Sequence, residues 1–293
     1  MRPMQLLIWG WLTAVLGTAG YSLSAAESSY RVESVQNERG LELRRDGRTV
    51  LQYHIAVADP PAGIDPVYRR SGFLHPVATP AGAVVTADFP VDHPHQHGIF
   101  SAWVKTSFKG RSVDFWNQAG KTGAVEHVRV IDTTSGPGWA GFQVELQHLD
   151  LAASGGSIPV LREVWTLTLQ AAGPEHLFDL ESRQTCIADT PLTVEEYHYG
   201  GIAFRGCDAW FSNDAKQPAD FEFITSEGLG RDAGNHSRPN WVAAVGSVSG
   251  QRCGLAVLAH PQNFQHPSPV RLHPTKPYFA FSPCVLGAFQ FQP

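Results

Sequence analysis

The sequence predicts an all-β protein built as an antiparallel β-sandwich. Apolar and polar residues alternate with a period of two in several segments, as in half-buried strands. Glycine and proline, 28 and 21 residues in a chain of 293, recur along the whole sequence and supply the frequent turns that a sandwich requires. No window of about twelve residues carries the apolar stripe of an amphipathic helix.

The first 26 residues predict a signal peptide. Arg2 supplies a positive charge, residues 6–19 are mainly apolar, and Ser24-Ala25-Ala26 offers the small side chains that signal peptidase requires. A membrane anchor is the alternative, but a spanning helix needs roughly 20 apolar residues, and glycine and threonine interrupt this shorter run. We therefore predict cleavage near Ala26 and a periplasmic or secreted protein with no membrane span after cleavage.

The mature chain, residues 27–293, is predicted to be a single β-sandwich domain. Asp46-Gly47 lies between two strand-like runs and favours a tight hairpin, whose turn requires positive φ. Alternating apolar residues predict two long half-buried strands over 140–147 and 161–170. Three segments rich in glycine, proline and polar residues are predicted loops: 60–66, 155–159 and 228–239.

Charge and cysteine content limit the function classes. Without Arg2, 21 basic residues stand against 27 acidic ones, a net charge of −6 with neutral histidines. A nucleic-acid-binding protein would show a basic stripe, so no nucleic-acid partner is predicted. No CxxC pair indicates a zinc knuckle, and the cysteines are either disulfide-bonded or buried thiols. They are Cys186, Cys207, Cys253 and Cys284.

Residues 92–98 carry the strongest sign of a functional site. This segment, DHPHQHG, places His93, His95 and His97 at alternate positions, which project from one face of an extended strand. Three imidazoles on one face could bind a divalent metal such as Zn²⁺ or supply an acid–base pair. Pro94 restricts the backbone of His93, however, and a polyproline turn would separate the three rings. A polar strand or loop without a site is the alternative.

A second group of candidates follows directly. Asp114 next to Phe115-Trp116 suits a sugar pocket, where a ring face stacks on the sugar and a carboxylate accepts hydroxyl hydrogen bonds, although it could also cap a turn. We expect one pocket to gather both groups if 92–103 and 111–117 form a hairpin. The predicted catalytic residues are His93, His95, His97, Asp114 and His127. The predicted substrate-binding residues are Trp103, Trp116, Asn117 and Arg111.

A wider set of short motifs gives these residues a family context. The set comprises Asp88-Phe89-Pro90, residues 92–100, Ala102-Trp103, residues 113–116, Gly123–His127, Gly254-Leu255-Ala256 and His260-Pro261-Gln262-Asn263. With them, most of the mature chain resembles the bacterial family labelled "methane oxygenase PmoA". The resemblance implies a β-rich fold similar to galactose-mutarotase supersandwiches and a setting in carbohydrate breakdown.

The chain differs in one respect from the enzyme named in the label and in two respects from the family's own pattern. Subunits of particulate methane monooxygenase have several membrane-spanning helices, and the predicted mature chain has none. Many members have arginine before the glycine that matches Gly98, where this chain has His97. Members also usually continue past the position of Pro293, which implies that this chain lacks its final strand.

Together, these observations predict an exported protein that acts on a sugar or glycoside by histidine acid–base or metal-assisted chemistry. Its partner would be a small molecule or an oligosaccharide. No GxSxG, P-loop or dinucleotide motif is present, which argues against serine-hydrolase, nucleotide and Rossmann chemistry. Two alternatives stay open: a non-catalytic carbohydrate-binding module, and a metal-dependent oxygenase as the family label suggests.

Overall fold

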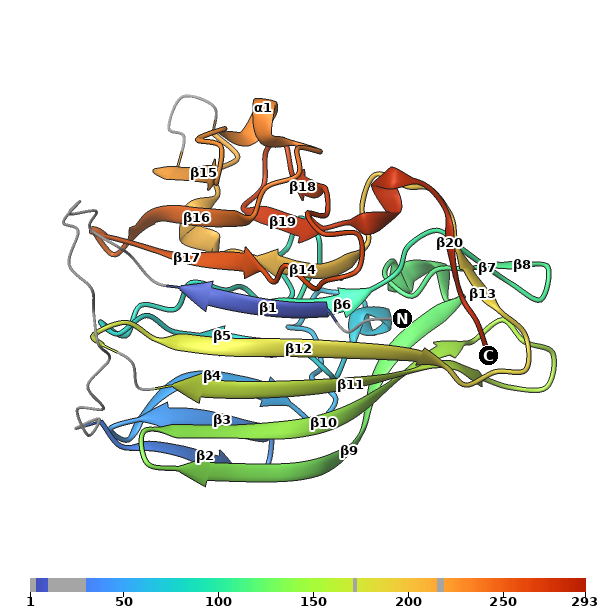
Figure 1. The fold of residues 1–293 in the computed structure, drawn as a ribbon, viewed down its shortest axis with the longest axis horizontal. Coiled ribbons are helices and arrows are strands. Elements are labelled where there is room, and N and C mark those ends of the chain that lie inside the picture. Colours follow the sequence, from blue (N-terminus) through green and yellow to red (C-terminus); the bar gives the residue numbers. More distant parts are fainter. Residues whose placement is uncertain (1–3, 10–29, 171–172, 215–218) are drawn as a thin grey trace.

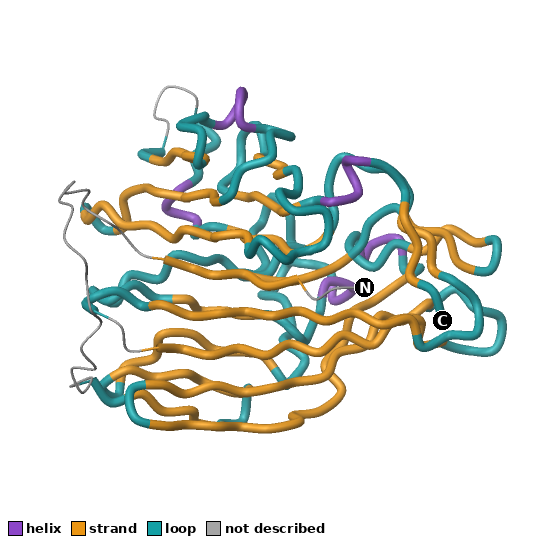
Figure 2. Tube along the Cα trace, viewed as in Figure 1, coloured by secondary structure: helices purple, strands orange, loops and turns teal. Residues whose placement is uncertain are grey.

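The computed structural model describes residues 4–9, 30–170, 173–214 and 219–293. These residues form two stacked layers of antiparallel β-sheet, with a smaller sheet at one end (Figure 1). Strands and their connecting loops dominate the described chain, and helical turns are short and scattered (Figure 2). The all-β sandwich predicted from the sequence is therefore confirmed.

The first eight-stranded sheet contains the longest strands. In β10 and β11, apolar residues at alternate positions are buried, and Phe142 faces Leu167 while Val144 faces Trp165 across the two strands. The two strands predicted over 140–147 and 161–170 are thus confirmed as neighbours. In spatial order the sheet consists of β15 (Phe221–Thr225), β16 (Trp241–Val248), β17 (Gln251–Ala259), β1 (Met4–Trp9), β12 (Leu177–Cys186), β11 (Ile158–Gln170), β10 (Trp139–Asp150) and β9 (Gly123–Gly136).

The second eight-stranded sheet has shorter strands. Asp46 and Gly47, with φ of 51° and 75°, connect β3 to β4 in the predicted hairpin, because both central positions of this turn need positive φ. In spatial order the sheet consists of β18 (Val270–Leu272), β19 (Tyr278–Phe281), β14 (Gly201–Arg205), β6 (Ile99–Ala102), β5 (Leu74–Val77), β4 (Arg48–His54), β3 (Gly40–Arg45) and β2 (Val32–Gln36).

A four-stranded sheet at one end corrects one prediction. The turn at Lys109-Gly110 does form a hairpin, but it joins β7 to β8, whereas β6 belongs to the second large sheet. The proposed hairpin of 92–103 with 111–117 is therefore wrong, because the chain leaves the second sheet after Ala102. The small sheet consists of β20 (Phe289–Phe291), β13 (Leu192–Val194), β7 (Thr106–Phe108) and β8 (Arg111–Val113).

Short helical turns occupy several loops, including parts of the predicted loops 60–66 and 228–239. None of the helices in the described part of the chain is long and apolar enough to cross a membrane. They are η1 (Pro66–Tyr68), η2 (Gln118–Gly120), η3 (Asp208–Trp210), α1 (Arg231–Gly234) and η4 (Pro283–Leu286).

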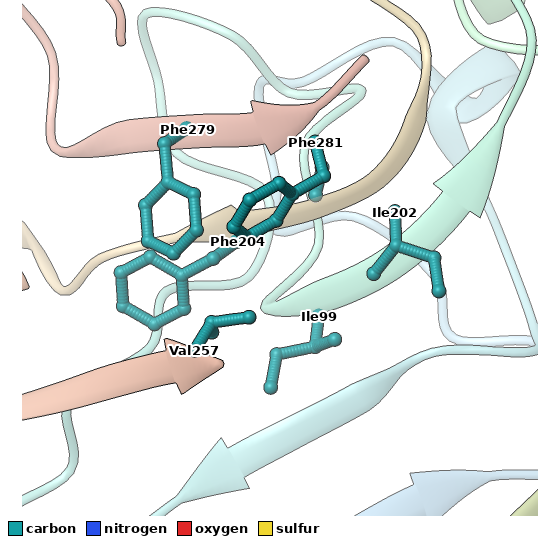
Figure 3. Close-up of a pocket in the computed structure, with 7 residues that line it drawn as sticks. Ile99, Ile202, Phe204, Val257, Phe279 and Phe281 are labelled. Atoms are coloured by element: carbon teal, nitrogen blue, oxygen red, sulfur yellow. The ribbon is translucent and has the colours of Figure 1, made fainter. Parts of the chain in front are cut away.

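The core lies between the two large sheets and is closely packed. A small apolar gap lies between β17 and the strands β6, β14 and β19, and Figure 3 shows the side chains around it. Its volume is about 10 Å³, close to the space of one water molecule, so it is a packing gap and not a ligand site. All four cysteines are free thiols, and burial raises the pKa of Cys207 to about 11 and that of Cys284 to about 12.

The predicted signal peptide lies largely outside the described residues, as does the expected cleavage site near Ala26. Its described part, Met4–Trp9, forms β1, which pairs with β12 on one side and β17 on the other (Figure 1). The structure is therefore that of the uncleaved chain, and export stays a prediction.

Candidate functional site

The histidine-rich segment 92–98 forms consecutive turns at one end of the second sheet. The backbone N–H of His93 donates to Pro90 O at 3.0 Å, and that of Gln96 donates to His93 O at 2.9 Å. The interpretation of this segment as an extended strand is therefore wrong. The turns bring the segment against the ends of β14 and β19, where Arg205 pairs with Tyr278.

A series of hydrogen bonds connects Arg205 through Asp92 to His93. The Arg205 guanidinium is fully buried and donates to both oxygens of Asp92, at 2.8 Å to Oδ1 and 3.0 Å to Oδ2. Asp92 Oδ2 in turn accepts a hydrogen bond of 2.7 Å from His93 Nδ1. Because Nδ1 carries the proton, the Nε2 atom of neutral His93 presents a lone pair. No hydrogen bond to Nε2 is found among the described residues.

Burial and neighbouring charges set the ionisation state of Asp92. Partial burial alone would raise the pKa of Asp92, but hydrogen bonds from His93 and Arg205, with the Arg205 charge, hold it far below its usual range. Lys276 Nζ lies 3.5 Å from Asp92 Oδ2 and adds a second cation. Asp92 is therefore a carboxylate at all physiological pH values and orients His93 throughout.

Two further imidazoles lie beside His93. The ring centroids of His95 and His273 are 5.6 Å and 5.4 Å from that of His93, and Tyr68 lies 6.5 Å from His95. Burial, followed by the nearby His93, lowers the pKa of His95 to about 3 and that of His273 to about 4. Both rings are neutral at pH 7 and present apolar faces. His273 Nδ1 accepts hydrogen bonds from the backbone N–H groups of Thr275 and Lys276, so its Nε2–H is a donor, whereas His95 keeps one acceptor nitrogen.

Aromatic contacts continue from His273 to the predicted residue Trp116. The His273 ring lies 6.0 Å from Tyr278, which lies 6.0 Å from Trp116, and Trp116 lies 5.2 Å from Tyr199. Trp116 is fully buried, and neither its Nε1 nor the hydroxyl of Tyr278 has a hydrogen-bond partner in the described part of the chain. The structure thus connects Trp116 to His93 and His95, but as a buried support and not as an exposed stacking surface.

His97 is separated from the other two predicted metal ligands. Its ring is fully buried against Phe73 and Phe89, Nδ1 donates to Asp88 Oδ1 at 2.8 Å, and Nε2 lies 3.4 Å from Gln118 Oε1. Among the described residues, no group of three or more His, Cys, Asp or Glu side chains is arranged to hold a metal ion. The set of His93, His95 and His97 therefore does not fit a metal, because the turns orient His97 into the core.

Asp114 caps a turn. Its Oδ1 accepts hydrogen bonds from the backbone N–H groups of Trp116 and Asn117, both at 2.8 Å, and its Oδ2 accepts one from Asn117 Nδ2 at 2.8 Å. The expectation that Asp114 orients a substrate or raises the pKa of a histidine is therefore corrected. Asn117 holds this turn, and its Nδ2 also lies 3.5 Å from the Tyr199 hydroxyl, at the edge of the aromatic group.

Three other predicted residues lie apart from the histidines. Trp103 is buried against Phe289 and Phe291 and donates from Nε1 to Gln184. Arg111 pairs with the buried carboxylate of Asp150. His127 makes its contacts with Tyr53, whose hydroxyl lies 2.9 Å from Nδ1, and with Ser71. The single pocket expected to hold all these residues is not formed.

The sequence reasoning missed the residues that complete the site. Arg205 had a detectable signal, because it is a charge at the end of the apolar run Gly201–Phe204, where burial requires a partner. His273 and Tyr68 lie in short loops whose sequence gives no sign of contact with residues 92–98. The full set of residues at this end of the second sheet could therefore be identified only from the three-dimensional structure.

Comparison with curated proteins and with solved structures gave no match. A family model described as "Family of unknown function (DUF6807)" matches residues 40–293, which include both large sheets apart from β1 and β2, and every site residue described above. The chain belongs to this family of unknown function, DUF6807.

Proposed function

We propose that this protein is an exported enzyme that acts on a sugar or glycoside, with His93 as its general base. The observation that carries the proposal is the alignment of Arg205, Asp92 and His93, with contacts of 2.7–3.0 Å. A carboxylate that holds one imidazole nitrogen fixes the tautomer and directs the other nitrogen toward the reacting group. The imidazolium formed by proton transfer is then stabilised by the adjacent Asp92.

The surroundings of His93 suit a sugar. His95, His273 and Tyr68 are partly exposed rings, which can stack on the apolar face of a sugar. Both imidazoles are neutral, since both have lowered pKa values, and they offer complementary groups to sugar hydroxyls: His95 has an acceptor nitrogen, and His273 donates from Nε2. In the proposed reaction, His93 Nε2 removes a proton from a sugar hydroxyl or from a carbon next to a carbonyl group.

The test combines binding with turnover. A panel of aldoses and glycosides is screened by thermal shift, and ligands that bind are followed by NMR for anomer exchange, solvent deuterium incorporation and glycoside cleavage. We expect His93→Gln to lose turnover by at least about 100-fold, the usual size of a general-base contribution. The matched control is His176→Gln, in the loop before β12, which should keep wild-type rates.

Each other result changes the assignment. Sugar binding without turnover in the wild type would favour the second candidate, a non-catalytic carbohydrate-binding module, which the group of partly exposed rings also suits. Turnover that survives His93→Gln would remove His93 as the base. Failure of every sugar to bind would contradict the proposal as a whole.

Export is a separate part of the proposal and has its own test. N-terminal sequencing of the protein from periplasm or culture medium should begin at or near Glu27. Cleavage there would also remove β1 from its position between β12 and β17. An intact Met1 on membrane-bound protein would contradict export with cleavage.

A further inference from the structure

A pocket with polar and apolar walls lies between the loop that precedes β5, the turn η2 and the start of β9. Its volume is about 360 Å³, within the range of small-molecule sites. Apolar Val57 and Val125 contribute to one part of the wall. The polar lining consists of Arg69, Arg70, Ser71, Gln118 and Glu126.

Arg70 is the unusual member of this lining. Its side chain is 3% exposed, yet no carboxylate of the described residues lies within 4.0 Å of its guanidinium. Its Nη2 donates to Ser101 O at 3.0 Å, its Nε has no hydrogen-bond partner in the described part of the chain, and its guanidinium lies 5.1 Å from the Phe100 ring centre. Buried charges in proteins are normally paired, so this guanidinium lacks a directly bound anion among the described residues.

The charge state of Arg70 also suits an anion-binding role. Burial lowers the pKa of Arg70 to about 10, because desolvation outweighs the longer-range attraction of Glu163. The guanidinium still carries its full charge at neutral pH. A positive charge is thus held at the pocket with no carboxylate of the described residues in direct contact.

The neighbouring groups favour an anion of low charge. The Ser71 hydroxyl accepts a hydrogen bond from the His127 backbone at 2.9 Å, which leaves its own proton to donate. Arg69 is exposed and pairs with the exposed Asp59 at 3.2 Å. Glu126 is an exposed acid on the same lining and would repel a dianion more than a monoanion.

We propose that this pocket binds the carboxylate of a small organic acid, held by the Arg70 guanidinium and the Ser71 hydroxyl. A carboxylate matches the planar donor edge of a guanidinium, and the apolar wall accommodates a carbon skeleton. The pocket adjoins the histidine site through the chain at Tyr68, because Tyr68 directly precedes Arg69 of the lining and its ring centre lies 6.5 Å from that of His95. A sugar acid such as a hexuronate could therefore reach both sites, and this choice of acid rests on the proposed function, whereas the carboxylate assignment does not.

The experiment is isothermal titration calorimetry of the full chain with D-glucuronate, D-glucose and inorganic phosphate. We expect glucuronate to bind at least 10-fold more tightly than glucose, which lacks the carboxylate. Glu126→Gln removes a like charge from an exposed position and should tighten glucuronate binding about 3-fold. Arg70→Lys keeps the charge but loses the planar donor edge, and it should weaken binding at least 10-fold.

Controls separate this proposal from the proposed function. His93→Gln should lower turnover at least about 100-fold. The same variant should bind acetate, a carboxylate without a sugar, as tightly as the wild type does. Equal affinity for glucuronate and glucose, or for phosphate and glucuronate, would overturn the carboxylate assignment. Should Arg70→Lys fail to fold, Glu126→Gln decides alone, and unchanged affinity in that variant would also overturn it.

Discussion

The two large sheets share a core but differ in regularity. In the first, β9 to β12 run for 14, 12, 13 and 10 residues and pair along most of their length. In the second, β5, β6 and β19 have four residues each, and the connections between strands carry the turns of 92–98 and the loop of His273. Long strands provide a rigid support, whereas interrupted strands leave chain free to gather polar side chains.

The two sheets also differ in how each holds a carboxylate. Glu163, in the first sheet, accepts hydrogen bonds from His148 at 2.7 Å, Trp165 at 2.6 Å and Ser182 at 2.5 Å, and it is fully buried. Asp92, beside the second sheet, is partly exposed and directs a histidine whose second nitrogen is open to a ligand. The first arrangement stabilises the fold, and the second is suited to chemistry.

The largest expected effect is on the first sheet. Glu163→Ala leaves His148, Trp165 and Ser182 buried without their acceptor, and the free energy of unfolding should fall by about 3–5 kcal/mol. Urea denaturation measures this change. The control is Glu222→Gln, which breaks an exposed ion pair with Arg252 and should cost less than about 1 kcal/mol. Equal losses of unfolding free energy in both variants would show that the buried hydrogen bonds of Glu163 stabilise the fold no more than an exposed ion pair does.

The same carboxylate predicts a pH dependence. Burial would raise the pKa of Glu163, but the hydrogen bond and charge of His148, with Ser182 and Trp165, hold it at about 2, below its ordinary value of 4.5. Its contribution to stability is therefore present above pH 4.5 and is lost as the pH falls toward 2, by about 3 kcal/mol. Unfolding curves between pH 6 and pH 2 should show this slope in the wild type and a flatter one in Glu163→Gln.

A smaller effect, of a different kind, is expected beside the second sheet. His95→Ala removes a partly exposed ring next to His93, so sugar affinity should fall about 10-fold, the equivalent of about 1.4 kcal/mol. The melting temperature should change little, because no hydrogen bond to the His95 side chain is found among the described residues. Calorimetry and thermal unfolding give the two readouts, and a loss of stability without a loss of affinity would assign His95 to the fold alone.

The sequence predicted features that depend on near neighbours in the chain and missed those that depend on distant segments. Local patterns sufficed for the Asp46-Gly47 hairpin and for the long strands β10 and β11, since turn chemistry and alternation act between near neighbours. His93 and His95 do lie together, but through consecutive turns and not on the extended strand that the sequence predicted. Arg205 and Arg70 were missed, because their importance depends on burial by distant segments.

Asp114 shows a second limit of sequence-based prediction, because its neighbours in the sequence fit two different roles. An acid beside aromatic residues fits a sugar pocket and a turn cap equally well, and only the hydrogen bonds to Trp116 and Asn117 distinguish the two. A pattern of residue types does not reveal which way a short side chain points. The turn-capping alternative, already open in the sequence, is the one that the structure supports.

The smallest expected effect concerns this cap. Asp114→Ala removes two hydrogen bonds to backbone N–H groups and should lower the free energy of unfolding by about 1 kcal/mol. Sugar affinity should stay at the wild-type level, in contrast to His95→Ala. Calorimetry of Asp114→Ala beside His95→Ala checks the contrast, and a larger loss of affinity in the Asp114 variant would restore a role for this residue in the site.

The central claim is that His93, His95 and His273 line the sugar site. NMR spectra of protein labelled with ¹⁵N in its 13 histidines, recorded during titration with a sugar that binds, test this claim directly. We predict that the Nε2 signal of His93 moves most, that the His95 and His273 signals also move, and that the His176 and His260 signals stay fixed. Sugar binding at saturation with unchanged signals from His93, His95 and His273 would contradict the account.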